Sequence, residues 1–233
     1  MFCRILRFLR NVILVLFLLS VLSVIIYRFA PVYYTPLMAI RSIEALKNGK
    51  ILQNKKTWVK IGNISPMMIR AVVASEDNLF MQHSGFSVDD IKKAMNENKK
   101  GRRLRGGSTI SQQTAKNVFL WPKRSYARKA LEAYFTLLIE LFWSKERIME
   151  VYLNVIETGN GIYGVEAAAK HYFRASASAL SKSQSALIAV CLPNPRKYNP
   201  AKPSQYILKR QYQIMNLMGK IGTVDLKKKK DKK

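Results

Sequence analysis

The chain has 233 residues, 48% of them hydrophobic and only 8 of them proline, so it can fold around one sizeable core with extra segments at its ends. Its 40 Lys and Arg residues against 14 Asp and Glu residues give a formal net charge of +26, which favours anionic partners such as phosphates, polyanions or an anionic membrane surface. The two cysteines, Cys3 and Cys191, are too few for a disulfide scaffold and exclude a CxxC metal site.

The first predicted element is a membrane helix over residues 11–27. This stretch carries no charge and would extend ~25 Å as a helix, close to the hydrocarbon thickness of a bilayer. A buried core helix and a cleaved signal peptide are the alternatives, but no small-residue cleavage site precedes Pro31. Arg4, Arg7 and Arg10 flank the stretch, so we expect residues 1–10 in the cytoplasm and the large C-terminal part outside it, anchored to the cytoplasmic (inner) membrane.

Three further regions follow the anchor. Residues 28–57 form a connector with an amphipathic stretch over residues 38–46, whose function cannot be read from the sequence. A globular body is expected over residues 58–218. Residues 219–233 form a basic tail, interpreted as a solvated charge run.

Helix start signals dominate the body, and clear period-2 strands are scarce, so a mainly α fold is expected. Serines precede most of the periodic apolar runs, as helix N-caps do. The expected helices begin at Pro66 after Ser65, at residue 91 after Ser87, at residue 127 after Ser125 and at residue 145 after Ser144, and others cover residues 165–173, 185–192 and 206–218.

Two adjacent carboxylates, Glu76 and Asp77, stand where the helix that begins at Pro66 should end. A carboxylate near a helix C-terminus meets the negative end of the helix dipole, so its placement suggests another use for the charge. The two histidines, His83 and His171, lie too far apart in the sequence for a helical zinc pair, and His83 is interpreted as a structural hydrogen-bonding residue. The sequence contains no GxSxG, SxxK or KTG motif, so acyl-transfer nucleophiles are not expected.

A Gly-Gly turn at residues 106–107 leads into a predicted helix that begins at Ser108 or Thr109. The helix carries amide and cationic side chains that suit a sugar or an anion: Gln112, Gln113, Lys116 and Asn117. The alternative is a flexible loop followed by an amphipathic surface helix. A GxxxxGK phosphate loop is lacking, which disfavours a nucleotide triphosphatase.

Basic residues cluster after this helix, at Lys123, Arg124, Arg128 and Lys129. Because no nucleic-acid-binding module is present, a phosphorylated lipid is a better partner than DNA or RNA. Glu132 follows Arg128 by four residues, and an ordinary intrahelical ion pair explains its position when it is taken alone.

Three motifs in this order resemble the peptidoglycan glycosyltransferases of glycosyltransferase family 51: EDNLFMQHSG from Glu76, GGSTISQQTAKN from Gly106, and RKALE from Arg128 followed by KERIMEVYLNVIETG from Lys145. The resemblance covers about residues 58–173. The short length and the missing transpeptidase motifs resemble the monofunctional, membrane-anchored members.

This resemblance implies a mainly α, lysozyme-like, two-lobed domain after a single transmembrane helix. It implies a substrate, lipid II, and a reaction that transfers the growing glycan chain onto the 4-hydroxyl of lipid II, with inversion, β-1,4 linkage and release of undecaprenyl pyrophosphate. It further implies a divalent cation, Mg²⁺ or Mn²⁺, and partners among the nascent glycan chain, the membrane and other cell-wall synthesis and division proteins, but no nucleic acid.

Matching motif positions assign the roles. Glu76 would be the general base, and Glu132 would position the pyrophosphate or a divalent ion. The residues that would line the sugar and pyrophosphate path are Ser108, Gln112, Gln113, Lys116, Arg124, Arg128 and Lys129. Asp77 is expected to support its loop, and Asn154 and Gly159 are expected to be structural. Ser87 and Ser111 depart from residues common in the family and affect the details of helix capping only.

Two other hypotheses remain at this point. A lysozyme-like enzyme could cleave finished glycan strands with Glu76 as its acid, or a non-enzymatic scaffold could bind anionic lipids or wall polymers through its basic face. The chemistry of the leading hypothesis also predicts that Glu76 is partly shielded from water and that nearby cations oppose the effect of this shielding.

Overall fold

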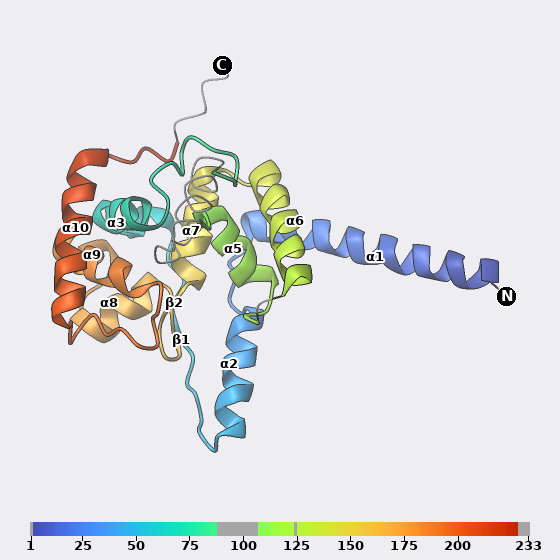
Figure 1. The fold of residues 1–233 in the computed structure, drawn as a ribbon, viewed down its shortest axis with the longest axis horizontal. Helices are drawn as coiled ribbons and strands as arrows, with labels where there is room; N and C mark the ends of the chain where they lie inside the picture. The colour runs from blue at the N-terminus through green and yellow to red at the C-terminus, as the bar shows by residue number, and fades with distance from the viewer. Residues whose placement is uncertain (1, 88–106, 124, 228–233) are drawn as a thin grey trace, which may run out of the picture.

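The computed structural model describes residues 2–87, 107–123 and 125–227, and it is built mainly of helices (Figure 1). Within these residues the strands form one short sheet, so the predicted mainly α class is confirmed. The helix predicted over residues 91–98 and its capping residues Asp89 and Asp90 lie outside the described residues.

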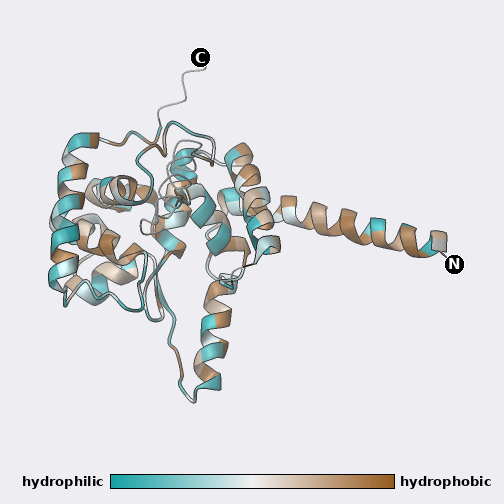
Figure 2. Cartoon of the chain, viewed as in Figure 1, coloured by the Kyte–Doolittle hydropathy of each residue, from teal (hydrophilic) through white to brown (hydrophobic). Residues whose placement is uncertain are grey.

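Helix α1 (Phe2–Phe29) extends away from the body of the molecule (Figure 1). Its segment Cys3–Phe29 is the one helix of the described chain that is long and apolar enough to cross a membrane, with a mean hydropathy of 2.6 and only 6% of its most apolar window buried. Figure 2 shows the hydrophobic residues along almost its whole length. An apolar helix compatible with the predicted membrane anchor is therefore present, and it is longer than the uncharged stretch of residues 11–27.

The C-terminal end of α1 is fastened to the body by side chains from two other helices. Trp143 donates its indole Nε1–H to the carbonyl oxygen of Val24 at 2.8 Å, and Arg147 donates to the carbonyl oxygens of Tyr27, at 2.8 and 3.1 Å, and Ala30, at 2.5 Å. The last carbonyls of a helix have no partner within the helix, so Arg147 acts as a C-terminal cap supplied from elsewhere.

The connector forms helix α2 (Pro36–Lys47), which starts at the N-cap Thr35 with a proline in its first turn. From α2 the chain returns to the body through strand β1 (Lys55–Lys56) and the short 3-10 helix η1 (Ile61–Asn63). The amphipathic stretch predicted over residues 38–46 is thus a helix that begins two residues earlier and ends one residue later.

The remaining helices fall into two groups that lie side by side (Figure 1). The first group contains α3 (Pro66–Glu76), α8 (Val165–Phe173), α9 (Lys182–Cys191) and α10 (Gln205–Ile221). The second contains α5 (Ile110–Phe119), α6 (Tyr126–Phe142) and α7 (Lys145–Val155). One continuous hydrophobic core joins them and includes Met68, Ile110, Tyr152 and Ile188, none of which is more than 1% exposed.

The serine N-caps predicted from the sequence are confirmed at Ser65, Ser125 and Ser144, whose side chains accept from the first turns of α3, α6 and α7. The prediction for α9 was wrong at its start. This helix begins at Lys182, three residues before the expected start at Ser185, because Ser181 and Gln184 form a reciprocal capping box.

Strands β2 (Glu157–Gly159) and β3 (Ile162–Tyr163) pair antiparallel, and β1 adds parallel to β3, which gives the order β1-β3-β2. A register irregularity lies between Glu157 and Gly159. A Cβ at Gly159 would lie 2.1 Å from the hydroxyl of Tyr172, so a larger residue here would displace that side chain. Through the pairing of β1 with β3, the sheet joins the connector to the segment between α7 and α8. The short 3-10 helix η2 (Ala177–Ala179) follows α8.

Candidate active site

Glu76 is the last residue of α3, and its side chain meets α5 of the other helix group. The amide Nε2 of Gln113 donates to Glu76 Oε2 at 2.9 Å, and the hydroxyl of the fully buried Tyr152 donates to Gln113 Oε1 at 3.2 Å. Because the amide oxygen of Gln113 is held by Tyr152, the amide nitrogen is the end that is turned to the carboxylate of Glu76. Glu76 and Gln113, which were predicted separately as site residues, are brought together, whereas the part of Tyr152 was not predicted.

Burial raises the pKa of Glu76, and the adjacent Asp77 raises it further. The hydrogen bond from Gln113 and the positive charges of Lys116 and Arg210 act in the opposite direction. Since an efficient general base has a pKa near the working pH, this balance suits a carboxylate that must take a proton from a hydroxyl. The expectation that Glu76 is shielded and that cations oppose this shielding is confirmed.

Asp77 has a structural task beside Glu76. Its Oδ2 accepts from the backbone N–H of Ile110 at 3.0 Å, at the first residue of α5, and its Oδ1 lies 2.8 Å from Nε2 of His83. Because His83 Nδ1 accepts from the backbone N–H of Gly85 at 3.1 Å, the proton of a neutral imidazole lies on Nε2 and points to Asp77. Both residues support the loop, as the sequence indicated.

The start of α5 is fixed by its own capping box. Thr109 is the N-cap, and the side chain of Gln112 accepts from the Thr109 N–H at 3.0 Å. Gln112 is only 6% exposed, so the structure places it in the helix start, with its oxygen already used. Ser108 lies just before the cap, and its carbonyl oxygen is 3.5 Å from Gln113 Nε2.

Lys116 follows Gln113 on α5, and the negative charges of two carboxylates act on it. Burial lowers its pKa most, the positive charges of Arg128 and Lys129 lower it too, and the negative charges of Glu132 and Glu76 raise it. A cation with this surrounding is positioned to meet an anionic group that approaches Glu76.

Glu132 lies on α6 with its side chain only 4% exposed. Its Oε2 is 2.6 Å from Nη1 of Arg128, and its Oε1 pairs with Nζ of Lys129. Both ion pairs are intrahelical, at spacings of four and three residues, as the sequence allowed. Burial of the carboxylate makes them more than an ordinary surface pair, since they hold two cations beside Lys116. Arg124 lies outside the described residues.

The described residues do not fit a metal centre. Among them, no three His, Cys, Asp or Glu side chains gather closely enough to hold a metal ion. Both carboxylate oxygens of Glu132 are engaged by cationic side chains, which leaves this residue a poor ligand for Mg²⁺ or Mn²⁺.

A cavity of about 190 Å³ opens beside Gln113 and Lys116. Its walls come from α2, the end of α5, the segment of β2 and the proline-rich turn after α9, with Leu37, Arg41, Asn117, Trp121, Glu157 and Pro195 among the lining residues. The site as a whole therefore offers one shielded carboxylate, nearby cations and a hollow lined by Gln113 and Lys116.

Comparisons with known proteins agree with this chemistry. Residues 43–219 match a family model described as transglycosylase. A biosynthetic peptidoglycan transglycosylase of Bacteroides thetaiotaomicron is 58% identical over 233 residues, which cover 99% of this chain and 94% of the relative. Proteins with the same name from Caulobacter vibrioides and Bdellovibrio bacteriovorus are 52% identical over 219 and 204 residues, which cover 92% and 88% of this chain and 93% and 82% of the relatives.

Proposed function

The chain belongs to the transglycosylase family of peptidoglycan glycosyltransferases, and from this we propose that it polymerises glycan strands by transferring a growing lipid-pyrophosphate-linked chain onto lipid II. The observation that carries the proposal is the position of Glu76 at the end of α3, where it is shielded and hydrogen-bonded to Gln113 of α5, the helix that also carries Lys116. The enzyme is of the monofunctional kind.

The proposed reaction is a single inverting displacement. Glu76 takes the proton of the 4-hydroxyl of lipid II as that oxygen attacks the anomeric carbon of the growing chain. The bond from that carbon to the pyrophosphate oxygen breaks, a β-1,4 linkage forms, and undecaprenyl pyrophosphate leaves with the electron pair. General-base catalysis of this kind contributes about 10²–10⁴-fold to a rate.

The leaving group needs charge stabilisation more than a proton, because a pyrophosphate is a weak base. Lys116, Arg128 and Lys129 are the described cations that serve this purpose, and Glu132 holds the last two in place. Arg124 is proposed for the same role from its motif position. The described residues do not fit a metal centre. Polymerisation assays with EDTA, with Mg²⁺ and with Mn²⁺ measure the dependence of the rate on a divalent cation that the family resemblance predicts.

The test is polymerisation of labelled lipid II by the detergent-solubilised full chain, with products separated on a gel. We expect glycan chains that lysozyme digests from the wild type, and a loss of about 10³-fold in rate for Glu76→Gln. Asp225→Asn, at an exposed position after α10, is the matched control and should polymerise normally. Polymer from Glu76→Gln at the wild-type rate would refute the assignment of the base, and cleavage of finished strands without polymerisation would favour the strand-cleaving alternative.

We further propose that the N-terminus lies in the cytoplasm and the catalytic body on the outer side of the cytoplasmic membrane, because Arg4, Arg7 and Arg10 precede the apolar helix. Cys3 is exposed and Cys191 is buried, so a membrane-impermeant maleimide should label Cys3 only after the cells are lysed. An added cysteine at the exposed Ser178 should react in intact spheroplasts. Labelling of Cys3 before lysis would show that the N-terminus lies outside the cytoplasm, which is the opposite of the proposed topology.

A further inference from the structure

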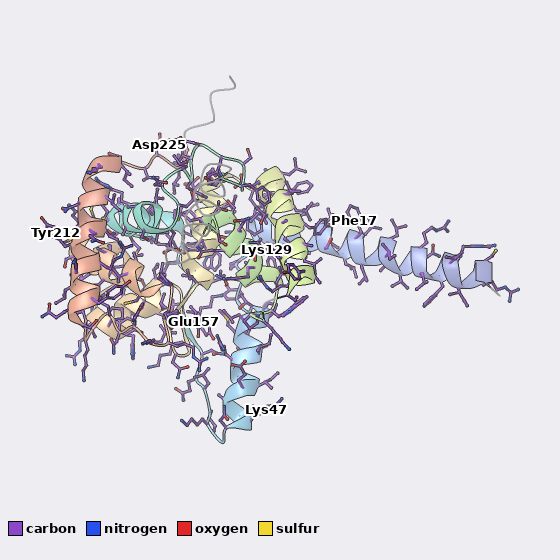
Figure 3. All side chains as sticks on the ribbon, viewed as in Figure 1. Phe17, Lys47, Lys129, Glu157, Tyr212 and Asp225 are labelled. Carbon is purple, nitrogen blue, oxygen red and sulfur yellow. The ribbon has the colours of Figure 1, made fainter. Side chains whose placement is uncertain are left out.

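Glu140 is a shielded carboxylate of α6 that the proposed reaction does not use. It lies two turns beyond Glu132, and Lys129, near the other end of the same helix, is labelled in Figure 3. Glu140 Oε1 lies 2.7 Å from Nζ of Lys145, the first residue of α7, and it also accepts from the hydroxyl of Ser111, in the first turn of α5, at 2.5 Å. The side chain of Glu140 is only 10% exposed. One carboxylate oxygen thus joins three helices.

The two partners of Glu140 extend its reach to the surroundings of Glu76. The bond from Ser111 runs between helices, although the sequence analysis connected Ser111 with helix capping only. Ser111 is fully buried, so its hydroxyl cannot exchange this partner for water. Lys145 places its Nζ 4.5 Å from the centre of the ring of Phe80, which is fully buried in the loop after Glu76. Glu140 is therefore connected to α5 on one side and to this loop on the other.

The backbone of the same loop lies directly against Glu140. Gly85 has a φ of +85°, a conformation that favours glycine, and a Cβ there would lie 3.0 Å from Cγ of Glu140 and 2.7 Å from Cγ2 of Thr136. The carbonyl oxygen of Gly85 accepts from the hydroxyl of Thr109, the N-cap of α5, at 2.6 Å. The loop is thus held between the start of α5 and the side chain of Glu140.

The two segments that meet at Glu140 carry the two ends of the hydrogen bond to the general base. The loop continues from Glu76, and the first turns of α5 carry Gln113, whose Nε2 donates to Glu76 Oε2 at 2.9 Å. Asp77 secures the backbone of α5 at Ile110, and Glu140 secures the side chain of the next residue, Ser111. Because a hydrogen bond weakens steeply as its length and angle depart from their optimum, a small shift of α5 would weaken the bond to Glu76.

We propose that Glu140 is a positioning residue for the general base: through Ser111 and Lys145 it holds the start of α5 and the loop after Glu76 at the separation that Gln113 bridges. This inference rests on the proposed function, because it takes Glu76 to be the base. Glu140 does not touch the reacting groups, and it acts on them through the amide of Gln113.

The direction of a pKa change separates this role from a plain effect of charge. The hydrogen bond from Gln113 lowers the pKa of Glu76 against the effect of burial, so a loosened Gln113 should raise that pKa. Loss of the negative charge of Glu140 would by itself favour the ionised form of Glu76 and lower its pKa. The other charges that act on Glu76 stay in place in the variants below, and they are those of Asp77, Lys116 and Arg210.

Glu140→Gln is the main variant. It should lower kcat for lipid II polymerisation about fivefold, leave the KM unchanged and move the acid limb of the kcat/KM profile to higher pH by about 0.5 unit. Glu166→Gln on α8 is the matched control, because Glu166 is also shielded, lies 2.9 Å from Nζ of Lys170 and accepts from the backbone N–H of Ala177 at 2.7 Å. It should lower the melting temperature to a similar extent and leave kcat and the acid limb unchanged.

Ser111→Ala is the second variant and the milder one, since it cuts the connection to α5 and leaves the pair of Glu140 and Lys145 intact. It should lower kcat about threefold and move the acid limb in the same direction as Glu140→Gln. Ser111→Thr keeps the hydroxyl and should polymerise like the wild type. This variant also tests the inference if Glu140→Gln does not fold.

A titration without substrate separates this inference from the proposed function. Carbon-13 NMR of the full chain labelled at its glutamate carboxyls reports the pKa of Glu76, and Glu76→Gln identifies the signal. If the wild type polymerises lipid II while Glu140→Gln and Ser111→Ala keep its kcat and its acid limb, or move the acid limb to lower pH, the positioning role is refuted and the polymerase stands. If the wild type makes no polymer but the pKa of Glu76 rises in both variants, the positioning role stands and the reaction is wrong.

Discussion

Glu76 at the end of α3 and Glu132 on α6 both act on the charge of Lys116, but their carboxylates are held in different ways. Glu76 is shielded with one neutral hydrogen bond, from Gln113, and its pKa is raised by burial. Glu132 has less solvent-exposed surface than Glu76, and each of its carboxylate oxygens forms an ion pair, one with Arg128 and one with Lys129. Placing the same residue type in these two environments separates a group that can exchange a proton from one that organises cations.

The largest effect on stability is expected when the ion-paired side of this comparison is broken. Glu132→Gln leaves the guanidinium of Arg128, 10% exposed, without its countercharge. Removal of one partner of a buried ion pair costs about 3 kcal/mol, which corresponds to a drop of roughly 6–12 °C in Tm for a domain of this size. Thermal unfolding in detergent measures it, with Asp225→Asn, at an exposed position after α10, as the control. An unchanged Tm would show that Glu132 does not stabilise the cation cluster.

A smaller effect is expected from the hydrogen bond that moderates Glu76. Gln113 donates to the carboxylate and so lowers its pKa against the effect of burial. Gln113→Leu should therefore raise the pKa of Glu76 further, move the acid limb of the kcat/KM profile to higher pH, and lower the rate at neutral pH about tenfold. Gln82→Leu, on the exposed surface of the following turn, is the control. An acid limb that stays in place would mean that Glu76 is not the titrating base.

The smallest effect, and the sharpest contrast with Glu132, concerns the stability of Glu76→Gln. A carboxyl whose pKa is raised by folding stabilises the folded state below its unfolded pKa, and this contribution is lost as the pH rises through the folded value. The wild type should therefore lose stability relative to Glu76→Gln between acidic and neutral pH, and at neutral pH the variant should be as stable or slightly more stable. Melting curves at several pH values in matched buffers measure this difference. A variant that is less stable than the wild type at neutral pH would place Glu76 in a structural role like that of Glu132.

Local signals in the sequence were sufficient for most of this description. The serines at 65, 125 and 144 cap helices because a short side chain can accept from the first turn whatever surrounds it, and the apolar run in α1 needs no partner to be recognised. At α9 three serines, Ser181, Ser183 and Ser185, compete for the same signal, and the reciprocal bond with Gln184 selects the first.

The contact of α2 with the sheet could not be predicted in the same way. Arg41 and Glu157 are separated by 116 positions, and neither belongs to a periodic pattern that would indicate the contact. Tyr152 shows the same limit, since nothing in the sequence indicated that its hydroxyl orients Gln113. Contacts between distant segments depend on how the two helix groups pack, and no local pattern carries that information.

The fastening of α1 to the body has a mechanical consequence. With Val24, Tyr27 and Ala30 all bound by side chains of α6 and α7, the anchor and the catalytic body turn and tilt together. In a helix each residue adds a rise of about 1.5 Å and a rotation of roughly 100°. The length of α1 between the bilayer and Val24 therefore sets the height of Glu76 above the lipid surface and the direction, around the axis of α1, in which the active site faces. One inserted residue would rotate the active site about the axis of α1 by roughly 100°, whereas seven inserted residues would return it to nearly the same orientation and raise it by about 10 Å.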